Sequence, residues 1–246
     1  MTGVENGRSA ALPSSRLDHF KHPLRNPLSR QEKNSRSAGS GLRFPADEAK
    51  HPWLPVLLRM HALVDAGIEV AVRAEERRRG SRRACRRGCD VCCRTQSDIP
   101  VFQIELAGIS WFCAEKLDGP ARETVRARLA QHAAGSRECP FLAESACAAH
   151  PVRPMACRLF TVFGRPCAEG EDAFHERRQD LLAPPPGLLA RAYRAMLPFH
   201  GVTDVVDQES WLDRGLVKTL AVNLPACDWR SLARLMDTAR PEPDAG

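Results

Sequence analysis

The chain has 246 residues, of which 43% are hydrophobic and 27% charged, so it is expected to fold around a packed core rather than to be disordered throughout. The net charge of +6 is concentrated in residues 1–50 and in residues 73–94, where nine Arg accompany three acidic side chains. No stretch approaches the roughly 18 to 20 apolar residues of a membrane span, and the first residues lack the apolar core of a secretory signal, which predicts a cytoplasmic protein without a membrane partner.

The first half of the chain is expected to be an extension followed by helices. Residues 1–50 are rich in Ser, Arg, Asn, Gly and Pro and lack periodicity, which predicts a disordered extension. Residues 99–101 are expected to form a short extended segment, and residues 102–117 are expected to form a helix. Asp118-Gly119-Pro120 is expected to end this helix and to start another. The first helix is expected from about residue 52 to Gly80, because apolar residues recur there at helical spacing: Leu57, Met60, Val64, Ile68 and Ala71.

The second half is expected to be less regular. Residues 134–187 are rich in Pro, Gly and Cys, which is typical of a loop-rich region that needs stabilisation beyond its own secondary structure. Three short helices are expected after it, the first at residues 188–198, the second from Ser210 and the third from Asp228. The inward residues of the third helix are expected to be Leu232, Leu235 and Met236.

The fold class is therefore predicted to be mainly α. We expect a small, irregular, loop-rich helical domain at residues 51–175, organised around a Cys metal cluster, with helical N- and C-terminal additions. Residues 176–239 are expected to form a helical segment that packs on this domain, and residues 240–246 a disordered tail.

The ten Cys residues are the most informative feature, because disulfides are rare in the reducing cytoplasm and thiolates there are good metal ligands. Short spacings let neighbouring thiolates converge on one soft metal centre, whereas adjacent Cys side chains tend to point apart and to serve different metal atoms. Eight thiols suit either one polynuclear cluster or two sites of four. The predicted ligands are Cys85, Cys89, Cys92, Cys93, Cys139, Cys147, Cys157 and Cys167.

Four other residues are candidates for the site or for the core beside it. Cys113 lies on the apolar face of its helix and is expected in the core, and Cys227 is expected to be a structural thiol. His150 follows Cys147 by three residues and is an alternative ligand. Glu105 either pairs with Arg158, orients a site or is a solvated carboxylate.

Several motifs together resemble the CxxCxxCC cysteine-cluster family, also called YkgJ-like proteins or zinc- or iron-chelating domains. The resemblance covers roughly residues 81–170, and the chain departs from the family at His150, where a Tyr is usual, and at the variable eighth Cys. The motifs are Cys89-x2-Cys92-Cys93, Glu105 on a helix, Cys139-Pro140-Phe141-Leu142, Cys147, and Arg153-Pro154-Met155-Ala156-Cys157-Arg158.

The resemblance implies a cytosolic bacterial protein in which up to eight Cys chelate iron or zinc, and one branch of the family is similar to flagellin lysine N-methylases with an iron–sulfur cluster. Within its Arg-Pro motif, Pro154 is expected to fix the loop that presents Cys157. Arg153 and Arg158 are expected to hold that loop by hydrogen bonds to carbonyls or carboxylates.

These features leave three functions open. The first is a metalloprotein with an iron–sulfur cluster or zinc, the cluster being favoured, in a redox or methylase-like protein-modifying role. The second is a zinc-stapled module that binds nucleic acid or protein through residues 73–94; nucleic acid is not favoured, because few aromatic residues are interleaved. The third is metal trafficking or thiol redox at Cys92-Cys93. The sequence contains no Walker, Rossmann or hydrolase motif, so it assigns no catalytic residue, and it identifies neither a substrate nor a protein partner.

Overall fold

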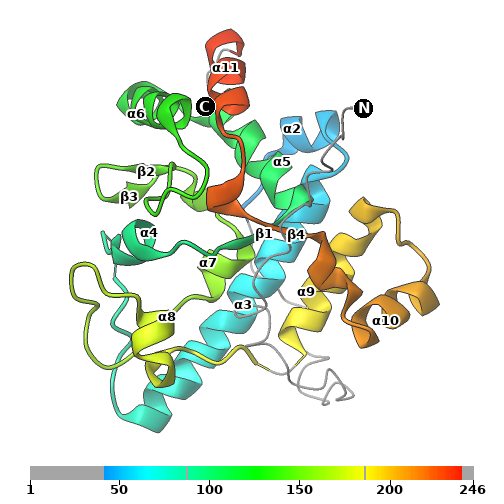
Figure 1. Cartoon of the computed structure of the whole chain (residues 1–246). Coiled ribbons are helices and arrows are strands. Elements are labelled where there is room, and N and C mark those ends of the chain that lie inside the picture. Colours follow the sequence, from blue (N-terminus) through cyan, green and yellow to red (C-terminus); the bar gives the residue numbers. More distant parts are fainter. Residues whose placement is uncertain (1–41, 87, 186, 240–246) are drawn as a thin grey trace, which may run out of the picture.

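The computed structural model describes residues 42–86, 88–185 and 187–239, and this part of the chain is mainly α-helical, as predicted (Figure 1). Two antiparallel pairs of short strands accompany the helices, β1 with β4 and β2 with β3. The α-helices are α2 (Pro45–Lys50), α3 (Leu54–Arg79), α4 (Val91–Thr95), α5 (Gln103–Trp111), α6 (Gly119–Gln131), α7 (Met155–Leu159), α8 (Ala173–Glu176), α9 (Leu188–Met196), α10 (Val205–Asp213) and α11 (Arg230–Thr238).

The remaining elements are short. The strands are β1 (Pro100–Phe102), β2 (Leu142–Ala143), β3 (Ala146–Cys147) and β4 (Ala221–Asn223). Single turns of 3₁₀-helix are η3 (His150–Val152), η4 (Arg178–Asp180), η5 (Leu197–His200), η6 (Leu216–Leu220) and η7 (Leu224–Ala226), and η2 (Phe112–Lys116) is a π-helical turn.

The long helix α3 is the centre of the structure (Figure 1). It is the first predicted helix, and the predicted apolar stripe is buried except for Ala71, which is partly buried; Leu57, Met60 and Val64 are fully inaccessible to solvent. Gly80 ends the helix with φ +64°, a left-handed conformation that glycine adopts without steric cost. α3 packs against α9 and α7, and one continuous core extends from α3 to residues of α11.

The segment expected to be extended pairs with a strand that the sequence did not indicate. β1 covers the predicted position and pairs with β4, with Pro100 opposite Asn223. The helix expected next forms as α5, which continues directly into the π-helical turn η2, and Asp118 then precedes α6. Val125 and Leu129 of α6 are fully buried, as predicted.

Two details of the C-terminal helices differ from the prediction. The helix expected from Ser210 begins five residues earlier, because the Asp204 carboxylate accepts hydrogen bonds from the N–H groups of Val206 and Asp207 and caps its N-terminus. In α11, Leu235 is 47% exposed instead of facing inward, whereas Leu232 and Met236 are buried as predicted.

Part of the segment assigned to the N-terminal extension is ordered. Residues 42–50 contain α2, which is attached by the ion pair of Asp47 with Lys116 (2.8 Å) and by the edge-to-face contact of Phe44 with Trp111. Residues 1–41 of the predicted extension and the predicted tail at residues 240–246 lie outside the described residues. The domain boundary between residues 175 and 176 stays a prediction. No helix of the described chain has the length and apolar character needed to cross a membrane.

A single buried cation joins the π-helical turn to the C-terminal helix. Arg122 on α6 is 8% exposed, and its guanidinium lies between the ends of η2 and α11. Helix ends leave carbonyl groups without intrahelical partners, and this side chain satisfies several of them at once. It donates to the carbonyls of Cys113, Ala114, Leu117, Met236 and Ala239 at 2.5–3.1 Å.

Replacing this cation should destabilise the fold strongly. In Arg122→Leu the buried carbonyls lose their donor, and we expect the free energy of unfolding to fall by about 3 kcal/mol in urea denaturation. Arg126→Leu is the matched control, since Arg126 lies on the same helix and pairs with Asp237 of α11 at an exposed position. A loss in Arg122→Leu no larger than in this control would contradict the assigned role.

Candidate metal centre

The eight predicted ligands lie on short elements and loops that are far apart in the sequence. Figure 1 shows α4, the β2–β3 hairpin, α7 and α8 together on the left of the view, opposite α9 and α10. α4, β3 and α7 carry four of the ligands, namely Cys92, Cys93, Cys147 and Cys157. The other four are in loops: Cys85, Cys89, Cys139 and Cys167.

Five of these cysteines form what we term the inner group: Cys92, Cys93, Cys139, Cys147 and Cys157. The Cys139 N–H donates to the Cys93 carbonyl at 2.7 Å, which joins the loop before β2 to α4. A hydrogen bond with the Cys93 thiol, together with burial, raises the pKa of Cys92 far above its ordinary value. Burial also raises the pKa of Cys139 to about 12 and that of Cys157 well above its usual range, and the negative charge of ionised Cys147 and Cys92 acts in the same direction on both. The five thiols therefore interact electrostatically.

The remaining three cysteines, Cys85, Cys89 and Cys167, form the outer group. Burial raises the pKa of Cys85 to about 11, and ionised Cys89, Cys92 and Cys167 add to this shift, so this group also interacts with the inner group. Two sulfur atoms of the outer group accept hydrogen bonds. The Val162 N–H donates to Cys85 Sγ at 3.3 Å, and Arg177 Nη2 donates to Cys167 Sγ at 3.6 Å. Cys89 is exposed, whereas the other two are partly buried.

The residue types fit a soft metal. Thiolates are the donors that zinc and iron–sulfur clusters prefer, and N–H groups directed at sulfur stabilise the ionised form. In the part of the chain that the structure describes, no three His, Cys, Asp or Glu side chains are already arranged to hold a metal ion.

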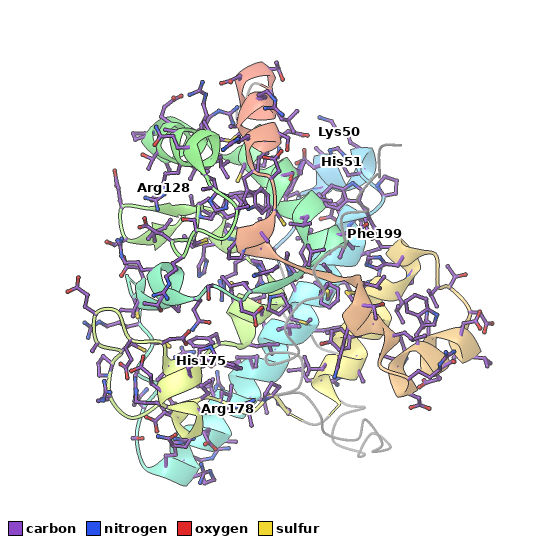
Figure 2. The ribbon with its side chains drawn as sticks, in the orientation of Figure 1. Lys50, His51, Arg128, His175, Arg178 and Phe199 are labelled. Carbon is purple, nitrogen blue, oxygen red and sulfur yellow. The ribbon has the colours of Figure 1, made fainter. Side chains whose placement is uncertain are left out.

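The β2–β3 hairpin, which the sequence did not indicate, positions Cys147. Its two-residue turn has left-handed backbone at Glu144 (φ +48°) and Ser145 (φ +60°), as a tight hairpin turn requires. Leu142 lies opposite Cys147 in the ladder, so the hairpin folds Cys147 back beside the Cys139 segment. Arg128, labelled in Figure 2, extends from α6 to the same segment and pairs with Glu138 at 2.9 Å.

The Arg-Pro loop is held as predicted. Arg158 donates to the carbonyls of Arg153 and Pro151 at 2.9 and 2.6 Å, and to the Asp65 carboxylate of α3 at 2.6 Å. Arg153 donates to the ring and the carbonyl of His150, which is exposed. Partial burial and the nearby guanidinium of Arg153 lower the pKa of His150.

Glu105 is neither a solvated carboxylate nor the partner of Arg158. It is fully buried, and its two oxygens accept hydrogen bonds from the N–H of Phe102 (3.0 Å) and from the N–H of Met155 (2.6 Å). Met155 is the first residue of α7, so Glu105 fixes the start of the helix that carries Cys157. His61 Nε2 lies 3.8 Å from the same carboxylate, and burial lowers the pKa of this imidazole.

The two cysteines assigned to structural roles lie apart from the outer group. Cys113 is fully buried in the main core, as predicted. Cys227 is partly buried, and its thiol donates to the Asn223 carbonyl at 3.5 Å.

Acidic neighbours neutralise much of the basic segment at residues 73–94. Arg78 and Arg79 both pair with Glu75 at 2.5 Å, and Arg94 pairs with Asp90 and Glu138 at 2.7 Å. Among the described residues of this segment, Arg77, Arg82 and Arg86 have no side-chain partner and are exposed.

Residues 84–180 match the family model CxxCxxCC, described as "Putative zinc- or iron-chelating domain". This segment of the chain is similar to the CxxCxxCC family. The matched range contains all eight predicted ligands and the elements that hold them, whereas Cys227 lies outside it. No curated protein and no solved structure matches the chain.

The carboxylate of Glu105 should be essential to the stability of the segment that matches the CxxCxxCC model. Glu105→Gln keeps the size of the side chain but leaves one of the two buried N–H groups without an acceptor, and we expect the free energy of unfolding in urea to fall by about 2 kcal/mol. Glu123→Gln, at an exposed position of α6, is the control and should have little effect. Equal stability of the two variants would show that Glu105 does not hold α7.

Cys113 should make the stability of the metal-free protein depend on pH. Burial, followed by the charge of Cys147, raises the pKa of the Cys113 thiol to about 12. In the unfolded chain the thiol ionises near pH ~8.5, so above this pH the unfolded state loses a proton that the folded state retains. Its stabilising contribution is complete below pH ~8.5 and is lost toward pH 12, by up to about 1.4 kcal/mol per pH unit.

Cys113→Ala should therefore weaken the loss of stability between about pH 8 and pH 10, measured by urea unfolding after metal removal. Cys89→Ala, at an exposed thiol, serves as the comparison. An unchanged pH dependence in Cys113→Ala would contradict the expectation.

Proposed function

We propose that the CxxCxxCC domain binds iron or zinc through its eight cysteines, and that it holds an iron–sulfur cluster in preference to zinc. The observation that carries this proposal is that the fold brings together cysteines spread over residues 85–167. Cys139 bonds to the Cys93 backbone, and the pKa of Cys85 responds to the charges of Cys89, Cys92 and Cys167. Burial favours the neutral form of these thiols, which is a cost that metal binding offsets by replacing the proton.

The donor set fits zinc and iron–sulfur alike, because four thiolates can hold either. The preference for iron–sulfur rests on the surroundings of the sulfur atoms. Each such cluster uses up to four thiolates, and the inner group alone provides five. Partly buried sulfur atoms with nearby positive charge suit a cluster, because burial and hydrogen bonds to sulfur tune its potential. The charges of Arg153 and Arg158 favour the ionised form of Cys147, although burial is the larger influence and raises its pKa.

The chain's own residues prepare the site. Glu105 and Arg158 hold α7 and so position Cys157, and the N–H groups of Val162 and Arg177 stabilise ionised Cys85 and Cys167. A bound cluster supplies electron transfer, and bound zinc supplies folding energy. A redox role follows from the cluster, whereas a methylase-like role rests on the family resemblance alone.

A nucleic-acid module is the weaker candidate. Nucleic-acid affinity depends on the number of cationic side chains free to neutralise phosphates, and the ion pairs with Glu75, Asp90 and Glu138 reduce that number in the basic segment. The described contacts therefore favour metal chelation.

Anaerobic purification with assays for iron, zinc and acid-labile sulfide tests the proposal. We expect a brown protein that absorbs near ~400 nm and contains iron and sulfide in matching amounts. Cys157→Ser and Cys89→Ser should both lower the metal content, whereas Cys227→Ser should leave it unchanged.

Full metal content in both ligand variants would contradict the assigned site. A colourless protein that holds zinc would overturn the preference for iron while retaining chelation.

A further inference from the structure

We propose that His61 makes the attachment of α7 sensitive to pH: when its imidazole takes up a second proton, the ring releases Arg158 and α7 loosens. The inference goes beyond the proposed metal binding and does not require that a metal is bound. Because α7 carries Cys157, the same event would displace one of the predicted ligands.

His61 lies between the two side chains that hold α7. Figure 1 shows α7 beside α3, and the two helices are in contact. Arg158 Nη2 lies 3.2 Å from His61 Nδ1, and Glu105 Oε1 lies 3.8 Å from His61 Nε2. Glu105 accepts the first N–H of α7, that of Met155, and Arg158 joins the last turn of α7 to Asp65 of α3. A single imidazole therefore lies against both attachments of the helix.

The contact with Arg158 fixes the protonation state of the ring. A guanidinium has only donors, so Nδ1 of His61 accepts this hydrogen bond, and the neutral ring carries its proton on Nε2. His61 is 3% exposed, and within the described chain its buried Nε2 has no hydrogen-bond partner, because 3.8 Å to Glu105 is too long for one. A second proton must therefore go to Nδ1, where it removes the acceptor of Arg158 and places two cations side by side.

The charged groups around the ring act in opposite directions. Burial is the largest influence on the pKa of His61 and lowers it. Glu105 of α5 and Asp65 of α3 favour the charged ring, whereas Arg158 of α7 disfavours it. From α9, Tyr193 stays neutral, because burial and the charge of Glu105 both raise its pKa. The folded protein therefore holds His61 in its neutral form.

The loop before α7 contributes a second imidazole, His150. Burial, then the charge of Arg153 and that of Arg158, lower the pKa of His150. This ring is exposed and is bonded to Arg153, whereas Arg158 bonds to His61. His150 is therefore the group whose titration the test must separate from that of His61.

Release of Arg158 weakens the contacts on which α7 depends. Its guanidinium also donates to the carbonyls of Arg153 and Pro151, and a helix of five residues does not persist without such contacts. Once α7 detaches, water reaches His61 and its pKa returns toward about 6.5. The detached form then binds more protons than the attached form, so attachment is fully favoured above pH ~6.5 and is weakened as the pH falls below it.

Hydrogen exchange of the full-length protein, measured by mass spectrometry, tests the inference. After correction for the intrinsic rate, we expect the protection of the α7 amides to fall about tenfold between pH ~7.5 and pH ~5.5. His61→Gln keeps an acceptor for Arg158 but cannot become charged, so it should abolish this fall. His150→Gln is the matched control and should keep it. Protonation of the cysteines acts on all three proteins alike, so the difference between them reports His61.

A second measurement applies if His61→Gln does not fold. Exchange of the imidazole C2 proton, which mass spectrometry resolves for each His, gives the pH at which His61 becomes charged in the unsubstituted protein. The protection of α7 should fall over the same pH range.

Three results would overturn the inference: an equal fall in His61→Gln, α7 protection that stays constant while His61 becomes charged, or a His61 that stays neutral until the whole chain unfolds. None of them bears on metal binding, which the iron, zinc and sulfide assays test separately.

Discussion

The attachment of α7 to the helices around it is the constraint on which the rest of the metal centre depends. α7 has only five residues, too few to be stable as an isolated helix. Glu105 binds its first N–H, and Arg158 ties its last turn to Asp65 of α3 and to the preceding loop. Both side chains are buried, which protects the bond from Glu105 to the Met155 N–H from competition with water, whereas Asp65 is 51% exposed. Cys157 is positioned by this pair.

Side-chain hydrogen bonds also position the other short elements of the loop-rich region. Short elements between residues 134 and 187 gain their position from side chain-to-backbone bonds and ion pairs rather than from regular secondary structure. The Arg177–Glu171 pair fixes the Cys167 loop, and the left-handed turn at Glu144 and Ser145 fixes Cys147.

Much of the helical framework could be predicted from the sequence, because amphipathic periodicity reports burial directly. The stripe containing Leu57 and Val64 gave α3, and Gly80 marked its end. The pairing of β1 with β4 could not be predicted, since it joins segments more than a hundred residues apart and carries no local signal. The β2–β3 hairpin was missed because its turn uses Glu144 and Ser145 rather than the Asn-Gly or Asp-Gly typical of such turns.

The candidate site was predictable in composition but not in organisation. Cys spacing identified which thiols to consider, and the Arg-Pro motif indicated how Arg158 would hold its loop. The assignment of Cys85 and Cys167 to a separate small core depends on Val162 and Leu181, whose positions only the tertiary structure specifies. The burial of Glu105 likewise followed from packing that no short motif encodes.

X-ray absorption spectroscopy at the edge of the metal found in the anaerobically purified protein tests the central claim, that the cysteines are the ligands, most directly. The account predicts a first coordination shell made of sulfur alone, at about 2.3 Å. A first shell dominated by nitrogen or oxygen would contradict it.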